Sequence, residues 1–194
     1  MKTKSKALLM TLCAVLLVAA SVLGTMAYLT STAKVTNTFT IGTIGITLDE
    51  AKVNTDGTVV ANHPRVNENT YKLMPGRTYT KDPIVHVAAG SENSWIFVKV
   101  ENEIAAIEAD KKIAQQITDN GWNALNGVAN VYYKEYDGTV NDLPVFNNFT
   151  IRDNVDADEL ATYAGKTVKI TAYAVQKDNL TVTQAWDAVK DLTA

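Results

Sequence analysis

The residues that could carry chemistry in this chain are few, and their spacing matches no catalytic pattern. The sequence holds two histidines, His63 and His86, and a single cysteine, Cys13. A zinc hydrolase needs a pair of histidines at helical spacing with an acid nearby. His63 instead precedes a proline in a loop-like stretch, and His86 lies in the strand-like stretch PIVHVAA. His86 is the candidate metal ligand, although a strand histidine that faces solvent or a hydrogen-bonding partner is the commoner role.

Nucleophilic and acid–base chemistry has no better support. None of the serines in residues 28–194 lies in a Gly-x-Ser-x-Gly turn, and only two histidines are present as general bases. Carboxylate pairs such as Asp156 with Asp158 occur where helix caps and solubilising charges are expected, and no loop has calcium ligands at alternate positions closed by a glutamate. The prediction is a protein that is not an enzyme and binds no cofactor or metal.

A cluster of aromatic residues offers binding rather than catalysis. Three tyrosines are close in sequence, and three tryptophans are spread along the chain: Tyr132, Tyr133, Tyr136, Trp95, Trp122 and Trp186. They would suit a sugar-stacking platform, but packing in a core or on a sheet face is the commoner role of such residues.

The first 27 residues have the composition of a secretory signal peptide. Three lysines precede the apolar stretch 7–24, and Thr25 and Ala27 place small residues at positions −3 and −1 of a cut before Tyr28. The apolar stretch also reaches the lower length limit of a membrane-spanning helix, so an uncleaved anchor is the alternative. Cleavage would remove Cys13 and leave a secreted chain without a thiol or a disulfide.

The net charge of the chain limits the classes of partner that it can bind. The whole chain has a formal net charge of −3, and removing the lysines of the leader makes it more acidic. Binding to nucleic acid or anionic lipid needs clustered Lys and Arg, which the sequence lacks. We therefore expect no nucleic acid partner and no membrane association after cleavage, with the protein in the extracellular matrix or at the cell surface.

Most of residues 28–194 predict short strands separated by turns. Residues 34–48 alternate, with Gly42 and Gly45 as bulges or points of close backbone approach. Asp56-Gly57 indicates a hairpin with a primed turn, Asp137-Gly138 indicates a second hairpin, and Pro75-Gly76 indicates a type II turn. Further strands are expected in the stretches 80–90, 94–102, 128–140, 144–152 and 166–176. In residues 94–102, Ile96, Val98 and Val100 would share one face, and Trp95 and Phe97 the other.

Three short helices are expected between these strands. Residues 102–121 place isoleucines on one stripe, pair Glu108 with Lys112 and end at Asn120-Gly121. Residues 156–165 begin with a capping box of Asp156 and Glu159, and residues 181–191 begin with one of Thr181 and Gln184. Strands at short intervals with helices in the connections predict a mainly β fold, an antiparallel jelly-roll-type sandwich formed by residues 42–194.

The stretch 28–41 is a strand without a local partner. Its apolar residues alternate, and it has no glycine or proline to turn it back on a neighbour. Such a strand can stay disordered, can lie along its own sheet or can complete the sheet of a neighbouring molecule.

Three stretches of the sequence resemble the TasA/camelysin family of exported Gram-positive proteins, whose leaders are cut by a SipW-type signal peptidase. GTMAYLTSTAKVTNTFTIGTIGITL resembles the family's leader end, with a T-x-A cut, an aromatic residue and N-T-F-x-x-G-T. YKLMPGRTYTKDPIVHVAAGSENSWIFVKVE resembles its P-G-x-x-x-x-K-D segment and the following strand, and VKITAYAVQKDNLTVTQAWDAV resembles its closing strand and helix. The order and spacing of the three stretches carry more weight than any one of them.

The resemblance implies a subunit of biofilm-matrix or cell-surface fibres. Each copy would insert its N-terminal strand into the next, with Tyr28, Leu29, Val35 and Phe39 in the donor strand of residues 28–41. The partners would be further copies of the chain, a SipW-type signal peptidase and accessory matrix proteins. Two alternatives stay open: a camelysin-like surface metalloprotease, although no zinc-ligand pattern is present, and a monomeric adhesion or carbohydrate-binding module. Residues 103–126 match no signature.

Overall fold

The computed structural model describes residues 5–6, 10–18, 43–109 and 111–192. The chain divides into two units, Met1–Thr40 and Ile41–Ala194. In the first unit, residues 5–6 and 10–18 are helical, and among the described residues no helix has the length and apolar character needed to cross a bilayer. The predicted cut between Ala27 and Tyr28 and the predicted donor residues Leu29, Val35 and Phe39 lie outside the described residues.

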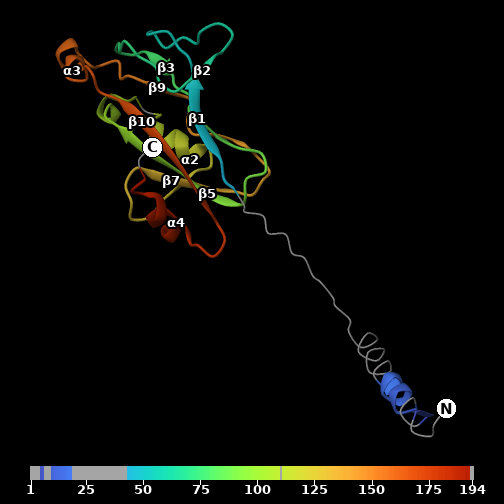
Figure 1. Ribbon diagram of the computed structural model, residues 1–194. Helices are drawn as coiled ribbons and strands as arrows, with labels where there is room; N and C mark the ends of the chain where they lie inside the picture. The colour runs from blue at the N-terminus through green and yellow to red at the C-terminus, as the bar shows by residue number, and fades with distance from the viewer. Residues whose placement is uncertain (1–4, 7–9, 19–42, 110, 193–194) are drawn as a thin grey trace. The chain divides into compact units, whose positions relative to one another are not determined.

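The second unit is mainly β, with every strand pairing antiparallel and short helices in the connections, so the predicted fold class is confirmed (Figure 1). The jelly-roll strand order stays a prediction. The strands are β1 Ile46–Ala51, β2 Arg65–Val66, β3 Thr78–Thr80, β4 Ile84–Val87, β5 Ser94–Asn102, β6 Asn123–Ala124, β7 Val131–Tyr136, β8 Asp142–Pro144, β9 Asn148–Thr150 and β10 Val168–Gln176. The helices are the 3-10 turn η1 Ala105–Ile107, α2 Ile113–Asp119, α3 Ala157–Ala161 and α4 Val182–Val189.

Three sheets make up this unit. One has the strand order β2-β1-β4-β8, the second has the order β10-β5-β7-β6, and β3 pairs with β9 in a third. The longest ladder joins β10 to β5, from Val168 opposite Asn102 to Gln176 opposite Ser94. Helix α4 lies against β10 and β5.

Strand β5 is covered on both faces, as its sequence predicts. Ile96 and Val98 belong to the main core between the sheets. On the other face Phe97 belongs to a second cluster with Trp186 of α4, and their ring centroids lie 5.4 Å apart. A strand buried on both faces needs apolar residues at nearly every position, which explains the unbroken run in its sequence.

The predicted long helix over residues 102–121 is wrong in its first half. Residue 102 is still in β5, and the described residues after it form η1 and an isolated bridge between Glu108 and Ile151. Glu108 is buried and accepts a hydrogen bond from the Asn102 amide, so it does not form the predicted surface pair with Lys112. Burial raises the pKa of Glu108. The second half is confirmed as α2, which ends at Asn120 before Gly121 with φ of 80°.

Two turn predictions are also corrected. Gly57 has a φ of 84°, but Asp56 does not have a positive φ, so the turn is not a primed one. Gly57 N–H instead donates to the carbonyl of Asn54 at 2.8 Å, as in a longer hairpin loop. The hairpin at Asp137-Gly138 is wrong, because the strand before it, β7, pairs with β5 and β6, and the strand after it, β8, pairs with β4.

Candidate functional site: a groove between two open strand edges

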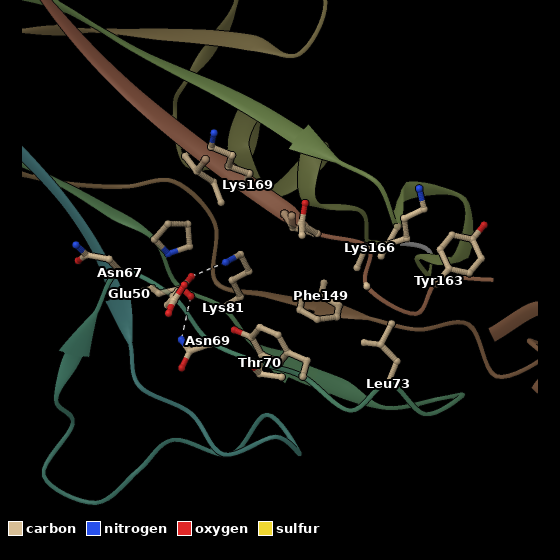
Figure 2. Close-up of a pocket in the computed structure, with 18 of the residues that line it drawn as sticks. Glu50, Asn67, Asn69, Thr70, Leu73, Lys81, Phe149, Tyr163, Lys166 and Lys169 are labelled. Carbon is tan, nitrogen blue, oxygen red and sulfur yellow. Dashed lines mark hydrogen bonds and ion pairs between the residues drawn. The ribbon is translucent and has the colours of Figure 1, made fainter. Parts of the chain in front are cut away.

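The second unit contains a groove of about 750 Å³. It is bounded by the end of β1, the loop that follows β2, and the chain from α3 into β10. Figure 2 shows Glu50, Lys81 and Asn69 grouped together, with Phe149, Leu73 and Tyr163 farther along the groove. The groove therefore has a polar part and an apolar part.

The apolar part is built on a cluster of aromatic rings. Tyr71 meets Phe149 edge-on at a centroid distance of 5.3 Å, and Phe149 stacks on Tyr79 at 5.1 Å. The Tyr71 hydroxyl donates to the carbonyl of Thr80 at 3.0 Å. Burial, together with the charges of Glu50 and Asp82, raises the pKa of Tyr71, so the phenol stays protonated. These rings are uncharged, which suits apolar side chains of an occupant.

The polar part is a buried ion pair. Lys81 Nζ lies 2.6 Å from Glu50 Oε2, and their side chains are only 9% and 5% exposed. The Asn69 amide donates to Glu50 Oε1 and to the carbonyl of Ala51, both at 2.9 Å. Burying two charges costs several kcal/mol (on the order of 5) before their attraction is counted, so such a pair contributes little net stability unless its remaining hydrogen-bonding capacity is used.

Strand β10 has an open edge next to this groove. In the described residues its only strand neighbour is β5. Ile170 and Ala172 of β10 are half-buried, whereas their partners Val100 and Val98 across the ladder are buried. The apolar side of β10 is therefore incompletely covered, although it faces the same core as β5.

Strand β1 repeats this pattern. Its pairing with β2 covers only Glu50 and Ala51, so its first four residues have a ladder partner on the β4 side alone within the described part of the chain. Ile46 and Leu48 are half-buried, whereas their partners Val87 and Val85 are buried. Strands β1 and β10 approach each other (Figure 1). The two strands border the groove where they come closest to it. Asp49 and Glu50 of β1 and Val168, Lys169 and Ile170 of β10 line it, whereas the half-buried Ile46, Leu48 and Ala172 lie outside its lining.

His86, the sequence candidate for a metal ligand, lies in β4 and is held by two aspartates. Its Nδ1 is 2.7 Å from Asp142 Oδ1, and its Nε2 is 3.0 Å from Asp49 Oδ1. The two ring nitrogens point to different carboxylates, and the described residues contain no group of three or more His, Cys, Asp or Glu side chains arranged to hold a metal ion. His63 lies in a loop with φ of 49°.

The Pro75-Gly76 turn lies next to Leu73, a residue that lines the groove. Arg77 N–H donates to the carbonyl of Met74 at 3.3 Å, and Gly76 has a φ of 70°, which is the geometry of a type II turn. Gly76 N–H also donates to the carbonyl of Ile151 at 3.1 Å. The turn thus ties the chain that lines the groove to the strand region around β9.

Packing explains most of the aromatic residues that suggested a sugar platform. Trp122, Tyr136 and Trp186 are buried. Trp95 and Tyr133 are half-buried, and their rings meet edge-on with centroids 5.8 Å apart. These rings mainly serve the two cores rather than a flat exposed surface.

The residues that define the polar part of the groove were not predicted from the sequence. Glu50 and Lys81 are 31 positions apart, and both stand in stretches where charged residues normally face solvent. The only sequence signal is the position of Glu50 at the end of an alternating strand, β1, whose last two residues are buried. Comparisons of the chain with protein-family models, with curated proteins and with solved structures found no match.

Proposed function

We propose that the chain is a secreted structural subunit that polymerises into extracellular fibres of a biofilm matrix or cell surface. Residues 28–41 of one copy would insert into the groove of the next, between β1 and β10. The observation that carries this proposal is a pair of open strand edges with half-buried apolar side chains, Ile46 and Leu48 on β1 and Ile170 and Ala172 on β10, together with a groove that both strands line. An added strand would hydrogen-bond to exposed backbone groups and cover these side chains.

The lengths of the two parts agree. An extended chain rises about 3.3 Å per residue, so residues 28–41 span about 45 Å. The nine residues of β10 span about 30 Å on the same basis. The segment is therefore long enough to follow the whole open edge and still leave a few residues as a linker.

A subunit that has both a donor strand and an acceptor groove assembles head to tail with other copies. Such a contact is heterologous, and it yields an open filament when the rotation between copies does not close a ring. The leader would keep the giving strand joined to the membrane until signal peptidase cuts before Tyr28. Export would then control polymerisation.

The test compares two chains by negative-stain electron microscopy and circular dichroism. The first starts at Tyr28 and the second at Gly42. We expect filaments from the first and folded, unpolymerised protein from the second. If both fold and neither polymerises at any salt concentration or pH tried, the proposal is wrong, and screens for bound glycan or zinc would then address the adhesion and metalloprotease alternatives.

A further inference from the structure

Backbone hydrogen bonds alone do not fix the register of an inserted strand. Backbone hydrogen bonds repeat along an open edge, so a strand shifted by two residues keeps the same bonds and the same inward face. A fibre with uniform subunits needs one register. Some side-chain contact must therefore distinguish the correct position from those two residues away.

The groove has a feature that can make this distinction. Among the charged residues that line it, Glu50 and Lys81 form a buried ion pair, whose side chains are only 5% and 9% exposed. Lys81 Nζ has one hydrogen-bonding partner in the described part of the chain, Glu50, whereas an ammonium group has three N–H donors. Glu50 accepts two hydrogen bonds, and a carboxylate has about four acceptor positions. The pair therefore retains both donor and acceptor capacity.

The segment 28–41 has a matching interruption. Its odd-numbered positions from 35 to 41 carry Val35, Asn37, Phe39 and Ile41, and its even-numbered positions carry lysine and threonines. In an extended chain the odd positions share one face. Within residues 35–41, Asn37 is therefore the one polar residue between apolar neighbours on the face that would cover the groove. Ser31 lies on the same face nearer the N-terminus and has a shorter side chain.

We propose that Asn37 of one copy hydrogen-bonds the buried Glu50–Lys81 pair of the next copy and thereby sets the register of the inserted strand. The inference rests on the proposed function. The Asn37 carbonyl accepts from Lys81, and its amide donates to Glu50. A shift of two residues places Val35 or Phe39 against the pair, which leaves its remaining donor and acceptor positions buried and unsatisfied. A buried polar contact that fixes strand or helix register is the best-attested use of such groups.

The first experiment measures the critical concentration for polymerisation of the chain that starts at Tyr28. Asn37→Leu should raise it about tenfold or more, because the pair loses its partner on burial. Ser31→Ala, a change at another odd-numbered polar position, is the matched control and should change it less than about twofold. Adding Glu50→Leu and Lys81→Met to Asn37→Leu makes the contact wholly apolar and should bring the critical concentration most of the way back to that of the unmodified chain.

The second experiment reads the register directly. The chain from Tyr28 has no cysteine of its own. Lys169 alternates along β10 with Val168 and Ile170, so it lies on the same side of the extended sheet as the threonines of the inserted strand. Lys169→Cys is combined in turn with Thr36→Cys, Thr38→Cys and Thr40→Cys, and the fibres are oxidised. We expect one of the three disulfides between copies to predominate. When Asn37→Leu is added to the same cysteine pairs, we expect at least two of the disulfides to form in comparable yield.

The outcomes separate the two proposals. If the unmodified chain forms no fibres, the proposed function fails and the register inference falls with it. If it forms fibres, and Asn37→Leu changes neither the critical concentration nor the predominant disulfide, insertion stands and the inference about Asn37 is overturned.

Discussion

At the scale of single residues, His86 shows how a candidate metal ligand can instead be an electrostatic contact between strands. It is placed opposite Asp142 in the β4–β8 ladder, and Asp49 binds both His86 and Arg65. The hydrogen bond that protonated His86 donates to Asp142 outweighs partial burial and raises the pKa of His86, with help from its bond to Asp49 and from the charges of both aspartates. Burial would raise the pKa of Asp49, but its bonds with Arg65 and His86 lower it overall.

This arrangement predicts a stability that depends on pH. Because the pKa of His86 is higher in the folded state, its stabilisation is complete below its unfolded pKa of about 6.5 and is lost as the pH rises through the folded pKa. His86→Gln should lower the free energy of unfolding by up to about 1 kcal/mol at low pH and by less above the folded pKa, since the contact is partly exposed. Urea titrations across this range measure the difference. His63→Asn is the control, and an equal pH dependence in both variants would contradict the prediction.

Gly57 makes a second prediction at this scale. Its φ is 84°, and an added Cβ would lie 2.7 Å from Tyr79 Cδ1 and 2.8 Å from Tyr79 Cα. Gly57→Ala should therefore lower the free energy of unfolding by at least about 2 kcal/mol, from left-handed strain and overpacking together. Gly138 has a φ of 85° with nothing within 4 Å of an added Cβ, so Gly138→Ala isolates the strain, at about 1 kcal/mol. Equal losses in denaturant melts would exclude the clash with Tyr79.

At the scale of elements, α4 is defined by its first turn and its buried face. Thr181 accepts from Gln184 N–H, and Gln184 Oε1 accepts from Thr181 N–H at 3.0 Å, so the predicted capping box is confirmed. Thr181→Ala should cost about 1 kcal/mol of unfolding free energy. Thr183 is exposed within the same helix, and Thr183→Ala should be neutral or slightly stabilising, because alanine has the higher helix propensity. A loss of equal size in both variants, measured by thermal unfolding, would argue against the cap.

The elements that could be predicted are those specified by local patterns. The two apolar faces of β5 and the alternation of Val168, Ile170 and Ala172 in β10 follow from strand periodicity, and both are confirmed. The first half of the helix over 102–121 failed because helical spacing of isoleucines also suits an irregular chain that buries Ile104 and Ile107 in the same core. The hairpin at Asp137-Gly138 failed because a turn sequence specifies a reversal, whereas long-range packing decides which sheet the next strand joins.

The groove is harder to predict from the sequence than these elements are. Glu50 is in β1 and Lys81 lies between β3 and β4, and their pairing depends on how two sheets meet. Tyr71 and Phe149 are separated by about half of the second unit's sequence, and their contact also follows from tertiary packing. A single sequence shows apolar alternation but gives no register between distant strands. The sequence could therefore suggest a strand that seeks a partner, but not the groove that receives it.

At the scale of the whole molecule, the proposed fibre makes a prediction about where the backbone becomes protected. Hydrogen exchange of the polymer against unpolymerised chain starting at Gly42 should show new amide protection in β10 and in the first residues of β1, because an inserted strand would pair with one of these open edges and cover the other. Strands β6 and β8 end the same two sheets on their other sides, and they serve as internal controls whose exchange should not change. Protection gained at β6 or β8 and absent from β10 would move the receiving edge to the opposite side of the sheets and exclude the groove at Glu50 and Lys81 as the point of insertion.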